Sequence, residues 1–109
     1  MKERKKISFR IRELIEEAIV DAYGDYEQEA AFLVMLEDNL PFPFMALVAG
    51  AEVEVTGVDQ SDEDRCIMAV CKRMGKKYRV SVTSLEWPGK PPREAEWIEA
   101  YKAWIRGGW

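Results

Sequence analysis

Two stretches near the start of the chain place apolar residues at the three- and four-residue spacing of an amphipathic helix. The first predicts a helix over residues 10–22, with glutamates on its opposite side. Gly24 follows, where the end of a helix favours a left-handed residue. We expect Asp25 to cap a second helix, with Gln28 completing a capping box, and this helix to continue to about Asn39. Apolar residues surround most of the second helix, which predicts burial on most of its sides.

After the second helix the apolar pattern changes to the alternation that is typical of β-strands. Pro41 and Pro43 end the helix and favour an edge position for the strand that follows, because proline cannot donate to a strand ladder. Gly75 and Lys76 predict a hairpin turn between the last two strands. The predicted strands cover residues 42–48, 52–58, 66–74 and 77–85.

A proline-rich linker over residues 88–92 precedes a last predicted helix over 93–106. The tryptophan, tyrosine and isoleucine residues of this helix form one stripe, which predicts core packing. The order of two helices, four short antiparallel strands and one helix predicts an α+β fold with a small curled sheet covered by helices. A partly open SH3-like barrel is one form that such a sheet can take.

The 109 residues suit one domain with a modest core, so we expect a single domain over residues 1–109. No apolar run approaches the roughly 18 residues of a membrane span, and we expect no membrane partner. The first six residues are mostly basic and lead into an amphipathic stretch rather than an apolar one, unlike a secretory signal. The expected location is the cytoplasm.

The chain has no histidine and two cysteines, which excludes Ser-His-Asp and Cys-His catalysis. Two thiols without histidine would leave only carboxylates to complete a zinc site. Cys66 and Cys71 lie at an odd offset in a predicted strand, so we expect no disulfide between them. Paired carboxylates can hydrolyse glycosides, but a chain of this length leaves little room for a substrate cleft. With no phosphate-binding loop or nucleophile motif either, we expect no enzymatic activity.

The net charge of −4 conceals a marked separation of acidic and basic residues. Residues 13–64 contain fifteen acidic residues and no lysine or arginine. Basic residues gather in residues 1–12 and 65–109. So long an acidic stretch argues against nucleic-acid binding and favours a cationic partner, either a metal ion or a basic surface.

Two clusters of carboxylates fall at predicted helix ends, and we expect them to gather around a divalent cation. Asp21 and Glu27 flank the bend between the first two helices, and Glu37 and Asp38 lie in the last turn of the second helix. Negative side chains at the carboxyl end of a helix cost up to about 1 kcal/mol, and a divalent cation would reverse the sign of that cost. Oxygen ligands without histidine or cysteine favour calcium, which tolerates irregular coordination better than magnesium does. Asp25 also has a simpler interpretation as a helix cap, and Glu29 as part of a solvated helix face.

A third acidic cluster, over residues 59–64, has the composition of a calcium loop but fails as an EF-hand. The glycine expected at the sixth loop position is Asp64, and the bidentate glutamate expected at the twelfth is Val70. We interpret this cluster as a solvated turn, with a weak secondary calcium site as the alternative.

Several sequence blocks form a combined pattern: Ile-Val-Asp-Ala-Tyr-Gly (19–24), Glu27-Gln28, Leu-Glu-Asp-Asn-Leu-Pro-Phe-Pro-Phe (36–44), Glu-Val-Glu-Val-Thr-Gly-Val (52–58), the Val82, Ser84, Leu85 segment and the tryptophan-bearing terminal helix. Together these blocks resemble the CcbP-like family of small bacterial calcium-binding proteins. The resemblance covers roughly residues 10–106. It implies calcium binding through surface carboxylates without an EF-hand, and a role as a calcium buffer or in calcium signalling. The acids that match by position are Asp21, Glu27, Glu37 and Asp38.

The leading hypothesis is therefore a calcium-binding protein that is not an enzyme. A protein-interaction module remains the alternative, in which the acidic face docks a basic partner.

Overall fold

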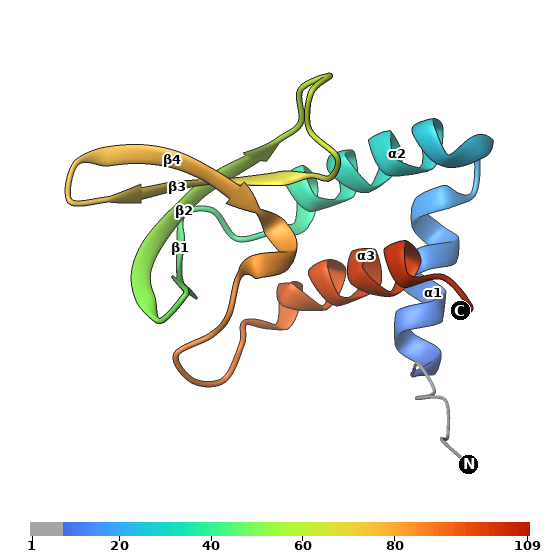
Figure 1. Cartoon of the computed structure of the whole chain (residues 1–109). Helices are drawn as coiled ribbons and strands as arrows, with labels where there is room; N and C mark the ends of the chain where they lie inside the picture. The colour runs from blue at the N-terminus through green and yellow to red at the C-terminus, as the bar shows by residue number, and fades with distance from the viewer. Residues whose placement is uncertain (1–7) are drawn as a thin grey trace, which may run out of the picture.

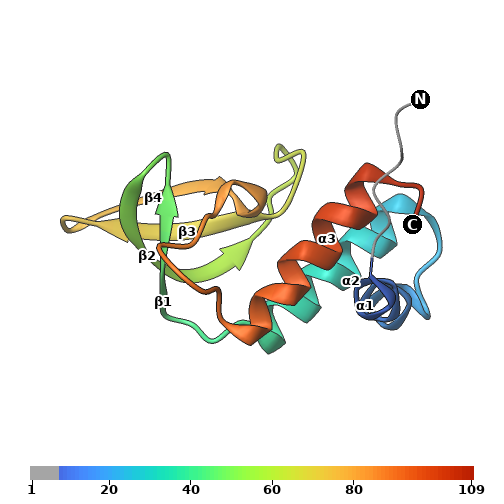
Figure 2. The ribbon, with the colours of Figure 1, turned by 90° about the horizontal axis from the view of Figure 1, so that it is seen from below.

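Three helices pack beside a four-stranded antiparallel sheet in the computed structural model, which describes residues 8–109 (Figure 1). The central layer consists of α2 (Gly24–Asn39) and α3 (Glu96–Arg106), which lie between the sheet and α1 (Phe9–Ile19) (Figure 2). The predicted α+β class and helix order are confirmed. The basic residues 1–6 lie outside the described part of the chain.

The first helix follows its apolar stripe. Leu14, Ile15 and Ala18 are buried, and the Ser8 hydroxyl caps the helix by accepting a hydrogen bond from the Ile11 amide at 3.1 Å. The helix ends at Ile19, three residues before the predicted end, so the chain is already turning where Asp21 lies.

The start of α2 differs from the prediction. The helix begins at Gly24, whose φ is +83°, and Tyr23 rather than Asp25 is its N-cap. Asp25 therefore lies within the first turn, where its charge suits the helix dipole but its side chain makes no cap. The predicted capping box is also wrong, because Gln28 accepts a hydrogen bond from the Trp104 indole at 2.8 Å instead.

The prediction that α2 is buried on most sides is also wrong. Phe32 and Leu36 are fully buried, and the rings of Tyr101 and Trp104 both lie 5.5 Å from the Phe32 ring, between centroids. On the outer side, by contrast, Val34 is 51% exposed. An apolar helix with neighbours on only part of its circumference leaves the rest in solvent.

The four strands form a meander in chain order. Val53 and Val55 of the second strand face the core, as the alternation predicts. A bulge after Val55 adds one residue and turns Val58 inward as well. The last hairpin turns at Met74 and Gly75, one residue earlier than predicted, because these two residues adopt the positive φ angles of a type I′ turn. The strands are β1 (Phe44–Val48), β2 (Ala51–Asp59), β3 (Met68–Arg73) and β4 (Lys76–Ser81).

The sheet is open rather than a closed barrel, and β1 does not pair with β4. The chain leaves β4 through a short 3₁₀ helix, η1 (Val82–Ser84), which shortens the fourth strand relative to its predicted end. Beyond η1, Leu47 and Glu86 exchange two backbone hydrogen bonds of 2.7 and 2.9 Å. This bridge covers part of the β1 edge. A second 3₁₀ helix, η2 (Arg93–Ala95), leads into α3 and replaces the first turn of the predicted last helix.

Cys66 and Cys71 form no disulfide, as expected. Within residues 8–109, no helix is both long and apolar enough to cross a membrane.

Tyr101 connects its own helix, α3, to α2 and to the sheet. Its ring is fully buried in α3, and its hydroxyl accepts a hydrogen bond from the Ile67 amide at 2.9 Å, next to β3. The same hydroxyl donates to the Glu29 carboxylate of α2 at 2.6 Å. Burial, followed by the contact with the Glu29 carboxylate, raises the pKa of Tyr101 well above its ordinary value, so the phenol stays protonated and can donate.

We predict that Tyr101→Phe lowers the free energy of unfolding by about 1–3 kcal/mol, because it leaves the Ile67 amide without a partner and removes one of the hydrogen-bond donors to the half-buried Glu29 carboxylate. Urea denaturation measures the change. Tyr78→Phe is the matched control, since the half-buried Tyr78 hydroxyl has no hydrogen bond among the described residues and its removal should change stability little. Equal effects of the two substitutions would contradict the role given to the Tyr101 hydroxyl.

Candidate metal centre

The four carboxylates selected from the sequence lie at the two ends of α2. Asp21 and Glu27 flank its start, Glu37 and Asp38 occupy its last turn, and all four are exposed. Asp38 lies eleven positions after Glu27 in the same helix, which corresponds to about 16 Å of rise. Within residues 8–109, no group of three or more acidic, cysteine or histidine side chains converges closely enough to hold a metal ion. The four residues thus form two pairs rather than one site.

The first pair lines a groove between α1 and α2. Asp21, Glu27 and Glu17 contribute carboxylates to this groove, whose volume is about 400 Å³. One oxygen of Glu27 already accepts a hydrogen bond from the Tyr23 amide at 3.1 Å. Glu27 therefore also fixes the start of α2, by satisfying an amide that the helix itself leaves unpaired.

The second pair, Glu37 and Asp38, lies in the last turn of α2, where the backbone carbonyls lack hydrogen-bond donors from the helix. Pro41 has no N–H, so the carbonyl of Glu37 lacks its usual partner four residues ahead. The Phe42 amide bonds to the Leu40 carbonyl at 3.0 Å and is not available to Asp38. In the described part of the chain, no donor reaches the Glu37 or Asp38 carbonyl, and no cation pairs with either carboxylate. Two exposed carboxylates and two carbonyls without a donor among the described residues thus lie in the last turn of α2, at the negative end of the helix dipole.

The third acidic cluster, residues 59–64, is partly neutralised by an arginine of β4. Arg79 of β4 donates two hydrogen bonds to one Asp59 oxygen, at 2.5 and 2.9 Å, and also pairs with Asp64. Asp64 accepts a further bond from the Ser61 amide at 2.8 Å. The arginine contact, followed by the Ser61 amide, lowers the pKa of Asp64 to about 2. This loop is therefore an ion-paired turn rather than one that is only solvated.

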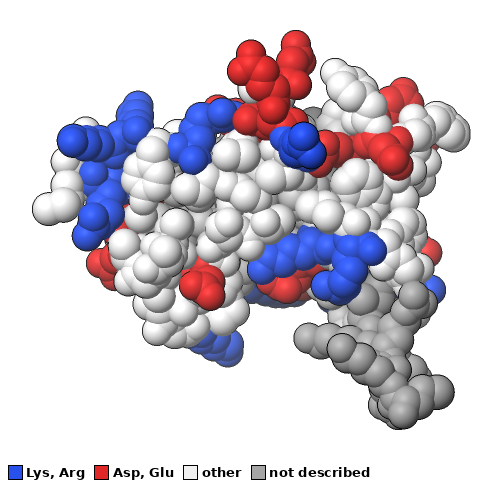
Figure 3. Space-filling view, in the orientation of Figure 1, with Lys and Arg blue, Asp and Glu red and all other residues white. Residues whose placement is uncertain are grey.

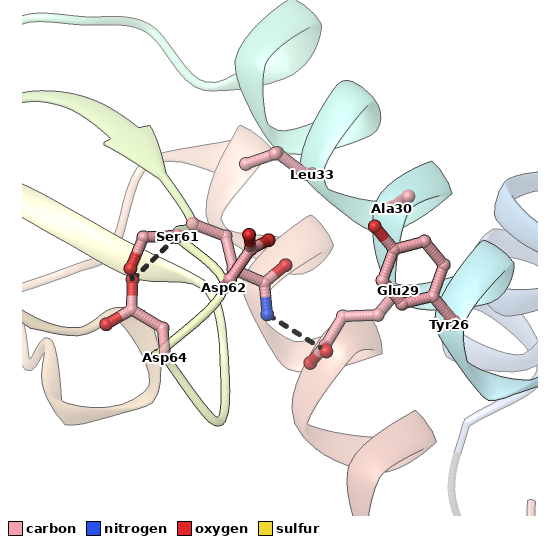
Figure 4. Close-up of a pocket in the computed structure, with 8 residues that line it drawn as sticks. Tyr26, Glu29, Ala30, Leu33, Ser61, Asp62 and Asp64 are labelled. Carbon is pink, nitrogen blue, oxygen red and sulfur yellow. Dashed lines mark hydrogen bonds between the residues drawn. The ribbon is translucent and has the colours of Figure 1, made fainter.

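Glu29 has a role that the sequence pattern does not indicate. It was expected on a solvated helix face, but its carboxylate accepts hydrogen bonds from Tyr101 and, at 3.0 Å, from the Gln60 amide. Figure 4 shows Glu29 and Asp62 on facing walls of a pocket of about 300 Å³, with Asp64 turned away toward Ser61. Glu29 thus anchors α2 to α3 and to the 59–64 loop. Its partners lie far along the chain, so helix periodicity alone could not reveal them.

Charge is partly separated in space. Acidic side chains gather over the 59–64 loop and the start of α2, whereas basic side chains cover the hairpin of β3 and β4 at the other end and also lie over α3 (Figure 3). The hairpin cations are too distant to neutralise the carboxylates at the start of α2, and none of the described ion pairs involves Asp21, Glu27, Glu37 or Asp38.

Comparison with known proteins identifies the family of the chain. Residues 10–105 match the family model of CcbP-type proteins, which is described as "Calcium binding". The chain belongs to the CcbP family of calcium-binding proteins. Calcium is therefore the relevant metal ion for the two carboxylate pairs. No curated protein sequence matches the chain.

Solved structures share the fold. The crystal structure of Anabaena CcbP is 23% identical, with a TM-score of 0.78 over 99% of this chain and 98% of that chain. A calcium binding protein in its calcium-binding form is also 23% identical, with a TM-score of 0.71 over 91% of each chain. At this identity, the likeness supports the CcbP fold for the whole described chain.

We predict that Arg79→Met raises the pKa of Asp64 from about 2 toward the ordinary 3.8, because it removes the largest cause of the depression. A carboxylate with a depressed pKa contributes stability above pH 3.8, and that contribution is lost as the pH falls through about 2. An NMR pH titration of the carboxyl carbons measures the shift. Lys77→Met removes a cation from the same strand that is not ion-paired, and it should leave Asp64 unchanged. An Asp64 pKa still near 2 in Arg79→Met would contradict the assigned cause.

Proposed function

We propose that Ca²⁺ binds chiefly at the carboxyl end of α2, through Glu37 and Asp38, and secondarily at the α1–α2 bend, through Asp21 and Glu27. The observation that carries the proposal is the set of oxygens at Glu37 and Asp38, two carboxylates and two backbone carbonyls without donors. The Asp21–Glu27 pair ranks second because one Glu27 oxygen is already occupied by the Tyr23 amide.

The chemistry of these donors fits calcium. Calcium takes six to eight oxygen ligands in irregular geometry, whereas magnesium requires a near-ideal octahedron. Each pair supplies hard oxygens from an exposed helix end, and water completes the coordination of an ion held there. Magnesium should bind more weakly at both pairs, because neither resembles a rigid cage.

Electrostatics favours the same two places. Carboxylates at the end of α2 face the negative pole of the helix, which costs up to about 1 kcal/mol in the absence of a cation. No lysine or arginine lies between residues 13 and 64 to reduce that cost. The 59–64 loop is a weaker candidate, because Arg79 already neutralises Asp59 and Asp64. We therefore propose binding without an EF-hand, and the earlier alternative of a weak calcium site in this loop loses its support.

We further propose that the chain acts as a cytoplasmic bacterial calcium buffer or signalling protein and not as an enzyme. Exposed pairs with few protein ligands release and take up calcium readily, as both roles require. The absence of histidine and of a nucleophile motif in the sequence supports a binding role over catalysis.

We predict that Asp38→Asn removes most of the stabilisation by calcium, because it deletes one charge from the main pair while keeping the side-chain shape. A ligand at a hundredfold excess over its Kd stabilises the native state by about 2.7 kcal/mol. For a domain of this size, that corresponds to a rise in Tm of roughly 10 °C. Melting curves with calcium, magnesium and chelator measure the effect, and titration calorimetry measures the binding itself.

Asp62→Asn is the matched control, an exposed aspartate outside both pairs, and it should retain the full calcium shift. Equal heats of calcium binding for the wild type and Asp38→Asn would count against the main site. A calcium shift abolished by Asp62→Asn instead would transfer the site to the 59–64 loop.

A further inference from the structure

The outer side of α2 exposes apolar residues that the fold leaves without a partner. Val34 is 51% exposed, and Val20, at the end of α1, is 71% exposed. Both line the groove between α1 and α2, and Ala30 and Met35 lie beside Val34 in the same groove. Apolar residues gathered in one hollow, rather than scattered singly, are typical of a binding surface.

The shape of the groove suits protruding side chains. Four of its ten lining residues are alanines, whose small side chains help to leave a hollow of about 400 Å³ between the two helices. Ala18 and Ala22 come from the α1 side, and Ala30 and Ala31 from α2. A helix that presents apolar side chains at three- and four-residue spacing could seat them there, in the way that amphipathic helices occupy grooves.

The acidic residues at the rim of the groove favour a positively charged binding partner. Glu17, Asp21 and Glu27 supply three carboxylates, and the surrounding sequence from residue 13 to residue 64 contains no cation. A partner that buries Val34 must therefore bring its own positive charges around an apolar stripe. The same rim repels phosphate groups, which disfavours nucleic acids and anionic membranes as occupants.

We propose that the groove between α1 and α2 binds a basic amphipathic helix of another protein. A second copy of this chain is a poor occupant in a two-fold dimer, because the same patch from each copy would set carboxylates against carboxylates. The docking surface is independent of the main calcium pair at the far end of α2. It shares Asp21 and Glu27 with the secondary pair, so its test is made in chelator, where calcium binding plays no part.

The test uses a fluorescent helical peptide of leucine and lysine, with the leucines at three- and four-residue spacing, and a scrambled peptide of the same composition. Fluorescence anisotropy at ~0.15 M salt limits long-range attraction between the charges. The periodic peptide should bind at least about tenfold more tightly than the scrambled one, since only it presents an apolar stripe. Equal binding of the two peptides would overturn the proposal, because it would reflect net charge alone.

Two pairs of variants locate the site. Val34→Ser should weaken binding of the periodic peptide about tenfold, and Glu17→Gln should weaken it by a smaller factor. The controls lie outside the groove. Met74→Ser likewise replaces an exposed apolar residue by serine, on the β3–β4 turn, and Glu63→Gln makes the same change as Glu17→Gln, in the 59–64 loop. Val34, Glu17, Met74 and Glu63 are all exposed, so circular dichroism should show unchanged folds.

Peptide affinity that is insensitive to Val34→Ser, or equally sensitive to Met74→Ser, would overturn the assignment. Sedimentation of the chain alone provides the remaining check. Self-association that Val34→Ser abolishes would identify a second copy as the occupant and would also overturn the proposal.

Discussion

The hydrogen bonds of the Tyr101 hydroxyl set the arrangement on which the other features depend. The group accepts from the Ile67 amide beside the sheet and donates to Glu29 on α2. Tyr101 itself packs against Phe32 of the same helix. The contacts therefore fix both the position of α2 and its rotation about its own axis. Once Phe32 and Glu29 face α3 and the sheet, Val34 must face outward. In the last turn, Leu36 remains in the core while Glu37 and Asp38 are exposed.

That arrangement determines which carboxylates of residues 13–64 have partners inside the protein. Some of its carboxylates are used inside the molecule: Glu29 by Tyr101, and Asp59 and Asp64 by Arg79. The pairs at the two ends of α2 receive no such cation within the described residues. The sequence thus divides its acids into those that hold the fold together and those that are left free to meet a cation. The chain belongs to a family described as calcium binding, which agrees with our proposal that the second group binds the ion.

Local patterns predicted local structure well. The stripe of α1, the alternation of β2 and the class of the fold follow from hydrophobic periodicity, which one segment carries by itself. The predictions failed where a distant residue decides the outcome. Gln28 was assigned to a capping box but bonds to Trp104, and α2 was expected to be buried although α3 and the sheet cover only part of it. The distance between Glu27 and Asp38 could also have been predicted. Both lie in the same predicted helix, and a rise of about 1.5 Å per residue places them too far apart to bind one ion.

A backbone NMR titration of the unmodified chain with calcium tests the account most directly, because it locates the ion without any substitution. Binding at the proposed pairs should shift the amide signals around Glu37 and Asp38 first and those around Asp21 and Glu27 at higher calcium, with the 59–64 loop little changed. The largest early shifts within the 59–64 loop, with both ends of α2 unaffected, would contradict it.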